Sequence, residues 1–402
     1  MSLTNQLLTS RNALIAGTAA TCLALYLQVR PILGNAEPPP KQKVIVAHNQ
    51  LELLQEDDHP YPSDAFPGGR LVRTEYGTIQ IFEWGPEDGE KVLLMHGIGT
   101  PCIALGDMAN EFVTQGYRVM LFGMSTCKIH VDIIANRADF FGRGYSDTPS
   151  DLPFDERLYT SQILLAIASS PISWTGPSSF HILGYSLGGA IAASFAAFHA
   201  NLLRSVTLVC PGGLVRTSHV SRRSRFLYSS GILPEWLLQR LAWKRLQPKD
   251  GTPSADLPGV QKEDTEDDED VDFDDVRVVT GARVGSVVKW QIRGNDGFVP
   301  AYMSTIRNAP IYGQHDKVWK VLGDELKKRR KGGPNAPKGL EKGKIGLVLA
   351  EKDPIVIVDE WLEDSKRVLG EDAVEAAIIK GGHEIAISKG KEVAQAAIKL
   401  WR

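Results

Sequence analysis

Ser186 lies at the centre of residues 184–188, which read Gly-Tyr-Ser-Leu-Gly. The segment follows an apolar stretch at 180–183 and precedes an alanine-rich stretch. A serine between small residues, at a strand-to-helix turn, is typical of a nucleophile elbow that exposes Oγ above the sheet. The amino end of the helix that follows would stabilise developing negative charge. We therefore predict that Ser186 is a nucleophile.

A serine hydroxyl needs a base to accept its proton. His383 lies in Lys-Gly-Gly-His-Glu at 380–384, between a short apolar stretch at 376–379 and the last predicted helix. Its two preceding glycines allow a loop that folds over the sheet edge. We predict His383 as the base. Other histidines fall in a predicted strand, a helix end and an inserted region: His181, His199 and His315.

An acid must orient the imidazole and stabilise its charged form. Asp353 follows the apolar run 345–349 and is the predicted acid, with Glu351 and Asp359 as the alternatives. The loop at 210–213 reads Cys-Pro-Gly-Gly and offers no carboxylate, which favours Asp353.

Two backbone N–H groups are expected to bind the oxyanion of a tetrahedral intermediate. One is the N–H of Leu187, directly after the nucleophile. The other is the N–H of Ile98, in the segment 96–101 that reads His-Gly-Ile-Gly-Thr-Pro. His96 is expected to make structural hydrogen bonds rather than act as a base.

Buried parallel strands must position these residues. Apolar runs without alternation suit strands that are covered on both faces. Helix-like stretches separate them at 105–115, 189–203 and 391–400, which indicates βαβ units. Residues 71–74 and 78–82 predict an antiparallel hairpin. The predicted fold class is α/β, a mostly parallel sheet flanked by helices. The predicted parallel strands are 92–95, 119–122, 180–183, 206–209 and 345–349.

The alternation of strands and helices stops between residues 214 and 342, which predicts an inserted helical cap. The core is therefore expected in two parts, 46–213 and 343–402. Within the cap, the acidic stretch 251–275 is interpreted as a solvated loop, with an acidic interaction tail as the alternative. The basic run 327–331 is interpreted as a helix end, with a membrane-surface or localisation patch as the alternative. Four tryptophans lie in helix-like surroundings of this region: Trp236, Trp243, Trp290 and Trp319.

Residues 1–45 are predicted to form an apolar segment followed by a linker. The stretch 13–29 has no charge and approaches the roughly 20 residues that a membrane helix needs. We expect a single membrane anchor, with a cleaved signal or transit peptide, or neither, as the alternatives. More basic residues follow this stretch than precede it, which places the catalytic domain in the cytosol. A cleaved N-terminus would instead give a secreted or organellar protein.

The composition limits the possible partners. The chain has 402 residues, a net charge of −3 and four scattered cysteines. Neither a nucleic-acid partner nor a zinc site or disulfide framework is indicated. No cofactor or metal is expected, and the expected partner is a small ester or acyl substrate. Membrane association is expected through residues 13–29.

Five motifs in this order resemble the AB hydrolase-1 branch of the α/β-hydrolases. They are His-Gly at 96–97, Phe-Gly-Arg-Gly-Tyr-Ser-Asp at 141–147, the serine motif, Asp353 and Gly-Gly-His-Glu at 381–384. That branch includes monoacylglycerol lipases, valacyclovir-hydrolase-like esterases and proline iminopeptidases. The resemblance implies the α/β-hydrolase fold and cofactor-free hydrolysis through an acyl-enzyme. Epoxide hydrolases and dehalogenases of this fold carry aspartate where Ser186 stands, so they are disfavoured.

The predicted function is hydrolysis of a carboxylic ester or related acyl bond. The aromatic content of the cap favours an apolar or lipid-like substrate. One alternative is a proline iminopeptidase-like peptidase, which would need a cap carboxylate such as Glu235 or Asp296 to bind the substrate amine. Another alternative is a catalytically idle binding protein on this fold.

Residues 123–138 depart from the family pattern, in which the strand at 118–122 leads directly into an Asp-x-x-Gly-x-Gly-x-Ser loop. Deleting them leaves Val-Met-Leu-Phe-Asp-Phe-Phe-Gly-Arg-Gly-Tyr-Ser-Asp. Their codons can begin with GTATGT, contain GCTAAC and end in CAG, as an intron does. We predict a translated intron of about 48 nucleotides, three for each inserted residue. The alternative is a genuine loop insertion at the carboxyl edge of the sheet.

Overall fold

The computed structural model describes most of the compact unit that runs from Lys43 to Arg402. The described residues are 43–46, 60–62, 65–122, 139–220, 222–228, 233–247, 273–333 and 336–402.

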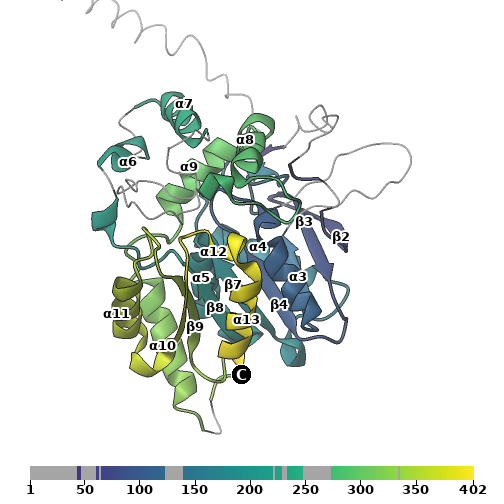
Figure 1. Ribbon diagram of the computed structural model, residues 1–402, viewed down its shortest axis with the longest axis vertical. Coiled ribbons are helices and arrows are strands. Elements are labelled where there is room, and N and C mark those ends of the chain that lie inside the picture. The colour runs from purple at the N-terminus through teal and green to yellow at the C-terminus, as the bar shows by residue number, and fades with distance from the viewer. Residues whose placement is uncertain are drawn as a thin grey trace, which may run out of the picture. The chain divides into compact units, whose positions relative to one another are not determined.

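A sheet of eight strands forms the centre of this unit (Figure 1). Its order is β10-β9-β8-β7-β4-β5-β3-β2. The strands from β10 to β5 are parallel, whereas β3 is antiparallel to β5 and to β2. The strands are β2 (Gly69–Thr74), β3 (Gly77–Trp84), β4 (Lys91–Met95), β5 (Arg118–Phe122), β7 (Phe180–Tyr185), β8 (Leu203–Val209), β9 (Ile345–Ala350) and β10 (Val374–Ile379). A separate antiparallel pair joins β1 (Val44–Ile45) to β6 (Thr148–Pro149).

The central strands are apolar because helices cover both of their faces. All residues of β7 and β9 are buried, and so are four of the five in β4. At the edge of the sheet, exposed positions of β10 alternate with half-buried ones. The predicted mostly parallel sheet is confirmed.

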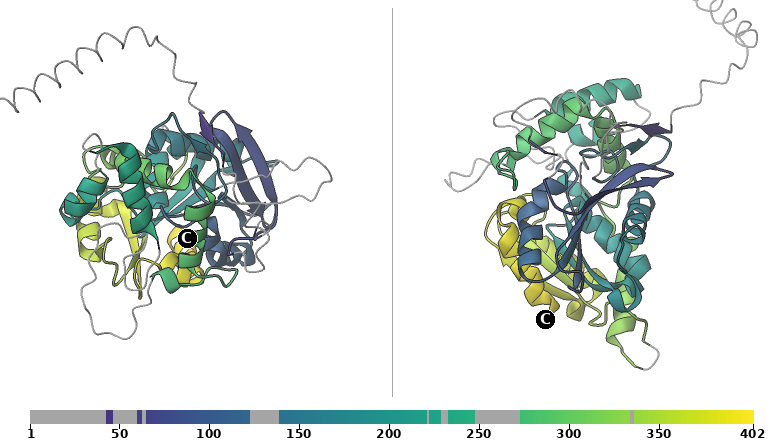
Figure 2. Two further views of the ribbon diagram at one scale, coloured as in Figure 1. Left: turned by 90° about the horizontal axis from the view of Figure 1, so that it is seen from above. Right: turned by 90° about the vertical axis from the view of Figure 1, so that its right-hand side faces the viewer.

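Helices form a layer on each face of the sheet (Figure 2). One layer contains α3 and α13, which pack against each other with the short α12 beside them. The other contains α4, α5, α10 and α11. The bounds are α3 (Gly106–Thr114), α4 (Glu156–Ala168), α5 (Leu187–His199), α10 (Val318–Arg330), α11 (Val358–Leu369), α12 (Ile385–Ser388) and α13 (Gly390–Trp401).

Four helices between β8 and β9 lie at the carboxyl ends of the parallel strands (Figure 1). They are α6 (Arg222–Leu227), α7 (Glu235–Leu246), α8 (Val284–Gly294) and α9 (Phe298–Asn308). Helix α10 also falls within the range predicted for the cap, but it packs against α5 and α11 beside the sheet. Its Trp319 is completely buried there. The layer above the sheet is therefore formed by α6 to α9.

Several predicted segments fall outside the described residues. These are the apolar stretch 13–29, the insertion 123–138 and positions 251–272 of the acidic loop. Residues Phe273–Asp275, at the end of that loop, form a 3-10 helix. Within the part of the chain that is described, no helix has the length and apolarity required to cross a bilayer.

Candidate active site

Ser186 occupies a strained turn between β7 and α5. Its φ is 54° and its ψ is −115°, values that are uncommon for a residue with a side chain. The turn requires close backbone contacts. A Cβ on Gly184 would lie 2.1 Å from the Gly188 carbonyl oxygen, and one on Gly188 would lie 2.4 Å from that of Met95. Glycine at these positions therefore allows the turn to form.

His383 lies beside Ser186, although 197 positions separate them in the chain. Its Nε2 is 3.1 Å from Ser186 Oγ, and its Nδ1 is 2.7 Å from Asp353 Oδ2. When neutral His383 donates Nδ1–H to the carboxylate, Nε2 is left to accept the serine proton. The structure thus brings the predicted nucleophile, base and acid into one hydrogen-bonded chain.

Asp353 is held in place by backbone donors on its own loop. Its Oδ1 accepts hydrogen bonds from the N–H groups of Ile355, at 2.8 Å, and Val356, at 2.9 Å. Burial acts to raise the pKa of Asp353, but attraction to His383 and these hydrogen bonds hold that pKa below its ordinary value. The carboxylate is therefore ionised at neutral pH. Of the two alternatives, Glu351 is exposed and Asp359 lies in the first turn of α11.

The two predicted oxyanion donors belong to residues that line the same cavity as Ser186 and His383. Leu187 is the first residue of α5, so its N–H has no partner within the helix. Ile98 lies in the loop after β4. The Gly188 N–H donates to the His96 carbonyl at 3.1 Å, which ties this loop to the elbow.

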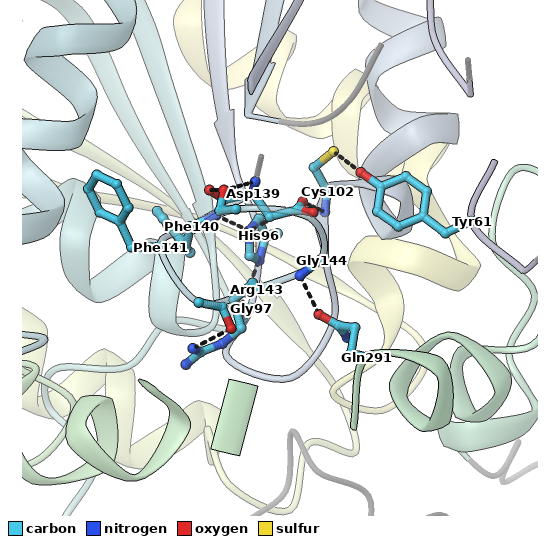
Figure 3. Close-up of polar contacts among 12 residues, drawn as sticks. Tyr61, His96, Gly97, Cys102, Asp139, Phe140, Phe141, Arg143, Gly144 and Gln291 are labelled. Atoms are coloured by element: carbon cyan, nitrogen blue, oxygen red, sulfur yellow. Dashed lines mark hydrogen bonds and ion pairs between the residues drawn. The ribbon is translucent and has the colours of Figure 1, made fainter. Parts of the chain in front are cut away.

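Three successive carbonyl groups of the loop after β4 are held by buried side chains. Figure 3 shows His96 and Arg143 of this network, together with Gln291, whose Oε1 also accepts from the Gly144 N–H. His96 Nδ1–H donates to Gly97 O at 2.8 Å. Arg143 Nε–H donates to Ile98 O at 2.6 Å, and Gln291 Nε2–H donates to Gly99 O at 2.9 Å. The peptide that carries the Ile98 N–H is therefore fixed on both sides.

Arg143 connects this loop to the helices above the sheet. Its side chain is completely buried, and Nη2–H donates to Thr305 Oγ1 of α9 at 3.0 Å. The rings of Phe298 and Tyr302 lie within 6 Å of its guanidinium carbon, at 5.6 and 5.8 Å. These contacts compensate a buried positive charge. Arg143 belongs to the sequence motif at 141–147, but the sequence around it did not indicate that it would bond to Ile98 and Thr305.

Two further buried groups in this network have shifted pKa values. Burial lowers the pKa of His96 to about 3, and its Nε2 accepts a hydrogen bond from the Phe140 N–H at 3.1 Å. Burial raises the pKa of Asp139 to about 8, although Cys102 N–H donates to its Oδ1 at 2.7 Å. His96 therefore acts as a hydrogen-bonding bracket, in keeping with the prediction that it is structural.

The cavity beside Ser186 is walled mainly by aliphatic side chains. They come from the loop after β8, the end of α9 with the chain that follows it, and the loop that carries Asp353. Tyr312 and His219 add polar atoms, and burial raises the pKa of Tyr312 to about 12. The aliphatic residues of the wall include Ile98, Val215, Val220, Ile306, Ile311, Ile355 and Val356.

The tryptophans that suggested an apolar site lie elsewhere. Trp290 and Trp319 are buried in helices α8 and α10, whereas Trp236 and Trp243 are exposed on α7. None of the four lines the described cavity. The apolar character of the site therefore comes from aliphatic residues, not from the tryptophans.

Two distant segments are joined side by side to form one wall of the cavity. Val215 and Tyr312 form a parallel β-bridge. The Gly213 N–H donates to Ile311 O at 2.6 Å, and the Gln314 N–H donates back to Gly213 O at 2.9 Å. The chain that leaves β8 and the chain that returns from α9 therefore hold each other.

An ion pair of Arg216 and polar contacts of two histidines fasten this wall to α11. Arg216 Nε lies 3.0 Å from Asp364 Oδ2, and His315 Nε2 lies 3.3 Å from the same oxygen. His219 Nε2 lies 2.9 Å from Glu360 Oε2. Burial acts to raise the pKa of Asp364, but the hydrogen bonds from Arg216 and His315 lower it below the ordinary value.

One group of three potential metal-ligating side chains occurs among the described residues. Donor atoms of Cys210, Asp353 and His383 lie within 4.8 Å of one another. Burial raises the pKa of the Cys210 thiol well above its ordinary value, so the thiol is protonated. Asp353 and His383 are hydrogen-bonded to each other, as in a proton relay. The protonated thiol of Cys210 lies beside this pair.

The carboxylates suggested for binding a substrate amine lie outside this cavity. Glu235 Oε1 pairs with Arg307 Nη1 at 2.9 Å. Asp296 is exposed near the start of α9. Neither belongs to the cavity lining.

Comparisons with known proteins agree with this fold. The model of the alpha/beta hydrolase family matches residues 92–396. A crystal structure titled as a membrane phospholipase A, described as a bacterial virulence factor, aligns with a TM-score of 0.51 at 14% identity over 99% of this chain and 97% of that one. An esterase from Rhodococcus sp. ECU1013 aligns with a TM-score of 0.50 at 14% identity over 83% and 98%. No curated protein matched by sequence.

The parallel sheet and the strained serine elbow at its carboxyl edge are features of the alpha/beta hydrolase fold. The family match extends from β4 into α13 and includes all three residues of the hydrogen-bonded chain. The chain therefore belongs to the alpha/beta hydrolase family.

Proposed function

We propose that this protein is a serine hydrolase that cleaves carboxylic esters or related acyl bonds through an acyl-enzyme. The observation that carries the proposal is the chain of hydrogen bonds from Ser186 Oγ through His383 to Asp353, at a strained elbow that borders a cavity. A serine becomes a useful nucleophile when a base at this distance accepts its proton.

In the acylation step, Ser186 Oγ attacks the carbonyl carbon while its proton passes to His383 Nε2. Asp353 stabilises the imidazolium that results. The N–H groups of Leu187 and Ile98 donate to the oxyanion. The carbon–oxygen bond to the leaving group then breaks, and His383 returns the proton to the departing alkoxide.

In the deacylation step, a water molecule takes the place of the leaving alcohol. His383 accepts one of its protons as the hydroxide attacks the acyl carbon. The second oxyanion collapses, the bond to Ser186 Oγ breaks, and the proton returns to that oxygen. The products are a carboxylic acid and free enzyme, so no external oxidant or cofactor is required.

The proposed substrate carries an apolar acyl group. Aliphatic side chains dominate the cavity wall, so a hydrocarbon chain would lose its water there without leaving polar groups unpaired. A peptidase of the iminopeptidase kind is less well supported, because Glu235 is paired with Arg307 and neither it nor Asp296 lines the cavity.

Labelling with a fluorophosphonate probe tests the reaction class. The wild type is expected to be labelled, and the Ser186→Ala variant is expected to lose the label completely. Ser173→Ala removes an exposed serine and should label as the wild type does. Labelling that survives Ser186→Ala, or no labelling of the folded wild type, would contradict the proposal; the second result would favour a binding protein.

Hydrolysis of p-nitrophenyl esters of graded chain length, compared with prolyl amides, tests the substrate class. Esters with apolar acyl chains are expected to react faster than the amides. Faster turnover of prolyl amides would favour the peptidase alternative.

A further inference from the structure

Helix α7 presents large apolar side chains to solvent. Trp236 is 65% exposed and Trp243 is 42% exposed. They are seven positions apart and therefore lie on the same face of the helix. Leu241 on α7 and Phe226 on the neighbouring α6 are also exposed, at 40% and 49%. Exposed tryptophans of this kind are uncommon unless a surface covers them.

Cations accompany these apolar residues. Arg240 and Lys244 are exposed on α7, and Arg240 lies between the two tryptophans on the helix face. Residues 216–247 contain seven lysines and arginines but one acidic residue, Glu235, whereas the whole chain carries a net charge of −3. Positive charge is therefore concentrated in this part of the protein.

The opposite face of α7 packs against the rest of the protein. Leu238, Ala242 and Leu246 are buried, and the helix packs against α9. The Glu235–Arg307 ion pair adds a further link to that helix. The tryptophans are thus held outward on a fixed support.

We propose that α6 and α7 form a docking surface for the face of an anionic phospholipid bilayer. Indole rings partition into the interfacial region of membranes, and nearby lysines and arginines attract acidic headgroups. The exposed Leu241 and Phe226 would enter the boundary of the acyl chains. This inference goes beyond the proposed reaction, and a lipid-binding experiment tests it without catalytic turnover.

Docking through this surface would place the cavity close to the lipid. Val220 and Ile306 belong to the cavity wall; Val220 lies just before α6, and Ile306 lies on α9, which supports α7. Figure 1 shows α7 on the side of α9 that faces away from the sheet, with α6 at the edge of this layer. An apolar substrate could thus pass from the bilayer to Ser186 with little exposure to water.

Tryptophan quenching by brominated lipid tests the insertion of α7. The full chain is mixed with phosphatidylcholine vesicles that contain 30% phosphatidylserine and brominated acyl chains. The wild type is expected to lose part of its emission, and Trp236→Phe/Trp243→Phe is expected to lose almost none. The other six tryptophans are buried or partly buried, so they supply an unquenched background. This readout reports on α7 even if residues 13–29 also hold the chain on the vesicle.

Flotation with the same vesicles tests the role of charge. Arg240→Glu/Lys244→Glu is expected to weaken binding by about 5-fold or more for each cation removed. Lys320→Glu/Lys327→Glu makes the same change in net charge on exposed positions of α10 and should bind as the wild type does. Phe198→Ser removes an exposed aromatic side chain from α5. It is the control for the loss of exposed aromatic residues from α7, and it should bind as the wild type does.

Three results would overturn the inference. One is equal quenching in the wild type and the tryptophan variant. Another is an equal effect of the charge reversals on α7 and α10. The third is a dimer in which Trp236 is covered without lipid, because the surface would then be a protein interface.

Discussion

At the scale of single residues, the buried chain from Asp353 to Ser186 carries the proposed reaction. Asp353 fixes the tautomer of His383 by accepting Nδ1–H at 2.7 Å, and two backbone donors fix Asp353 in turn. The acid therefore acts through orientation and charge, and it is not among the residues that line the described cavity.

Replacement of Asp353 by asparagine should preserve the fold and lower kcat by about 10³- to 10⁴-fold, because the amide would favour the wrong tautomer of His383. KM should change little. Glu351→Gln alters an exposed neighbour and serves as the control. Steady-state kinetics with a p-nitrophenyl ester measures both. An Asp353→Asn enzyme with near wild-type kcat would show that another group orients the imidazole.

Arg143 positions the loop that carries the Ile98 N–H, because its Nε–H donates to the Ile98 carbonyl oxygen at 2.6 Å. Arg143→Met should lower kcat by about 10- to 100-fold with a smaller change in KM, because a displaced donor fails mainly in the transition state. Arg143→Lys should recover part of the loss. The fluorophosphonate labelling rate and Tm are measured together. A lower Tm with unchanged labelling would mean that Arg143 supports only the fold.

At the scale of elements, the loop after β5 combines a fixed network with an inserted segment. Strand β5 keeps its register with β3 as far as Phe122. The contacts resume at Asp139, whose carbonyl oxygen accepts from Gln162 Nε2–H at 2.8 Å. On both flanks, residues that the structure describes are thus held to the core by contacts with other described residues.

Deletion of residues 123–138 should give a protein that folds with an equal or higher Tm and equal or higher esterase activity, because the flanking residues have their own contacts with the core and a shorter connection costs less closure entropy. A deletion of the same length shifted to 127–142 removes Asp139 and should destabilise the protein. Thermal unfolding and ester hydrolysis compare the three chains. Sequencing of the mature transcript tests the origin of the segment; a message that keeps these codons throughout would contradict a translated intron.

The sequence predicted the elements whose apolar runs are continuous, because these strands are buried on both faces and local pattern reports burial directly. The same reasoning brought Ser186, Asp353 and His383 to one edge, since carboxyl ends of parallel strands share an edge. Sequence reasoning could not show that Arg143 and Gln291 hold the oxyanion loop in place. Gln291 bonds to Gly99 across 192 positions, and such contacts leave no periodic trace.

At the scale of the whole molecule, ion pairs between Arg216, His219 or His315 and α11 connect the cavity wall to the core. Asp364 is the centre of this cluster. Its pKa is lowered in the folded state, so its contribution to stability is present above the unfolded value of about 3.9 and is lost as pH falls through the folded pKa.

Arg216→Met should therefore lower stability at pH 7, and the difference should shrink at a lower pH at which Asp364 is protonated in both folded proteins. High salt should reduce the difference at pH 7, because Arg216 is partly exposed. Urea unfolding at the two pH values measures the effect. Arg283→Met breaks an ion pair in which both side chains are exposed and is the control. A difference that does not depend on pH would exclude the charge of Asp364 as its source.

The bridge between Val215 and Tyr312 makes the region between them a separable module. Its entry and exit are clasped to each other, so the length and sequence of the intervening chain can change without moving the ends away from the nucleophile. Exchange of this module at these two points, with Gln291 and Thr305 retained because they hold the oxyanion loop and Arg143, would give a new substrate range on the same catalytic residues.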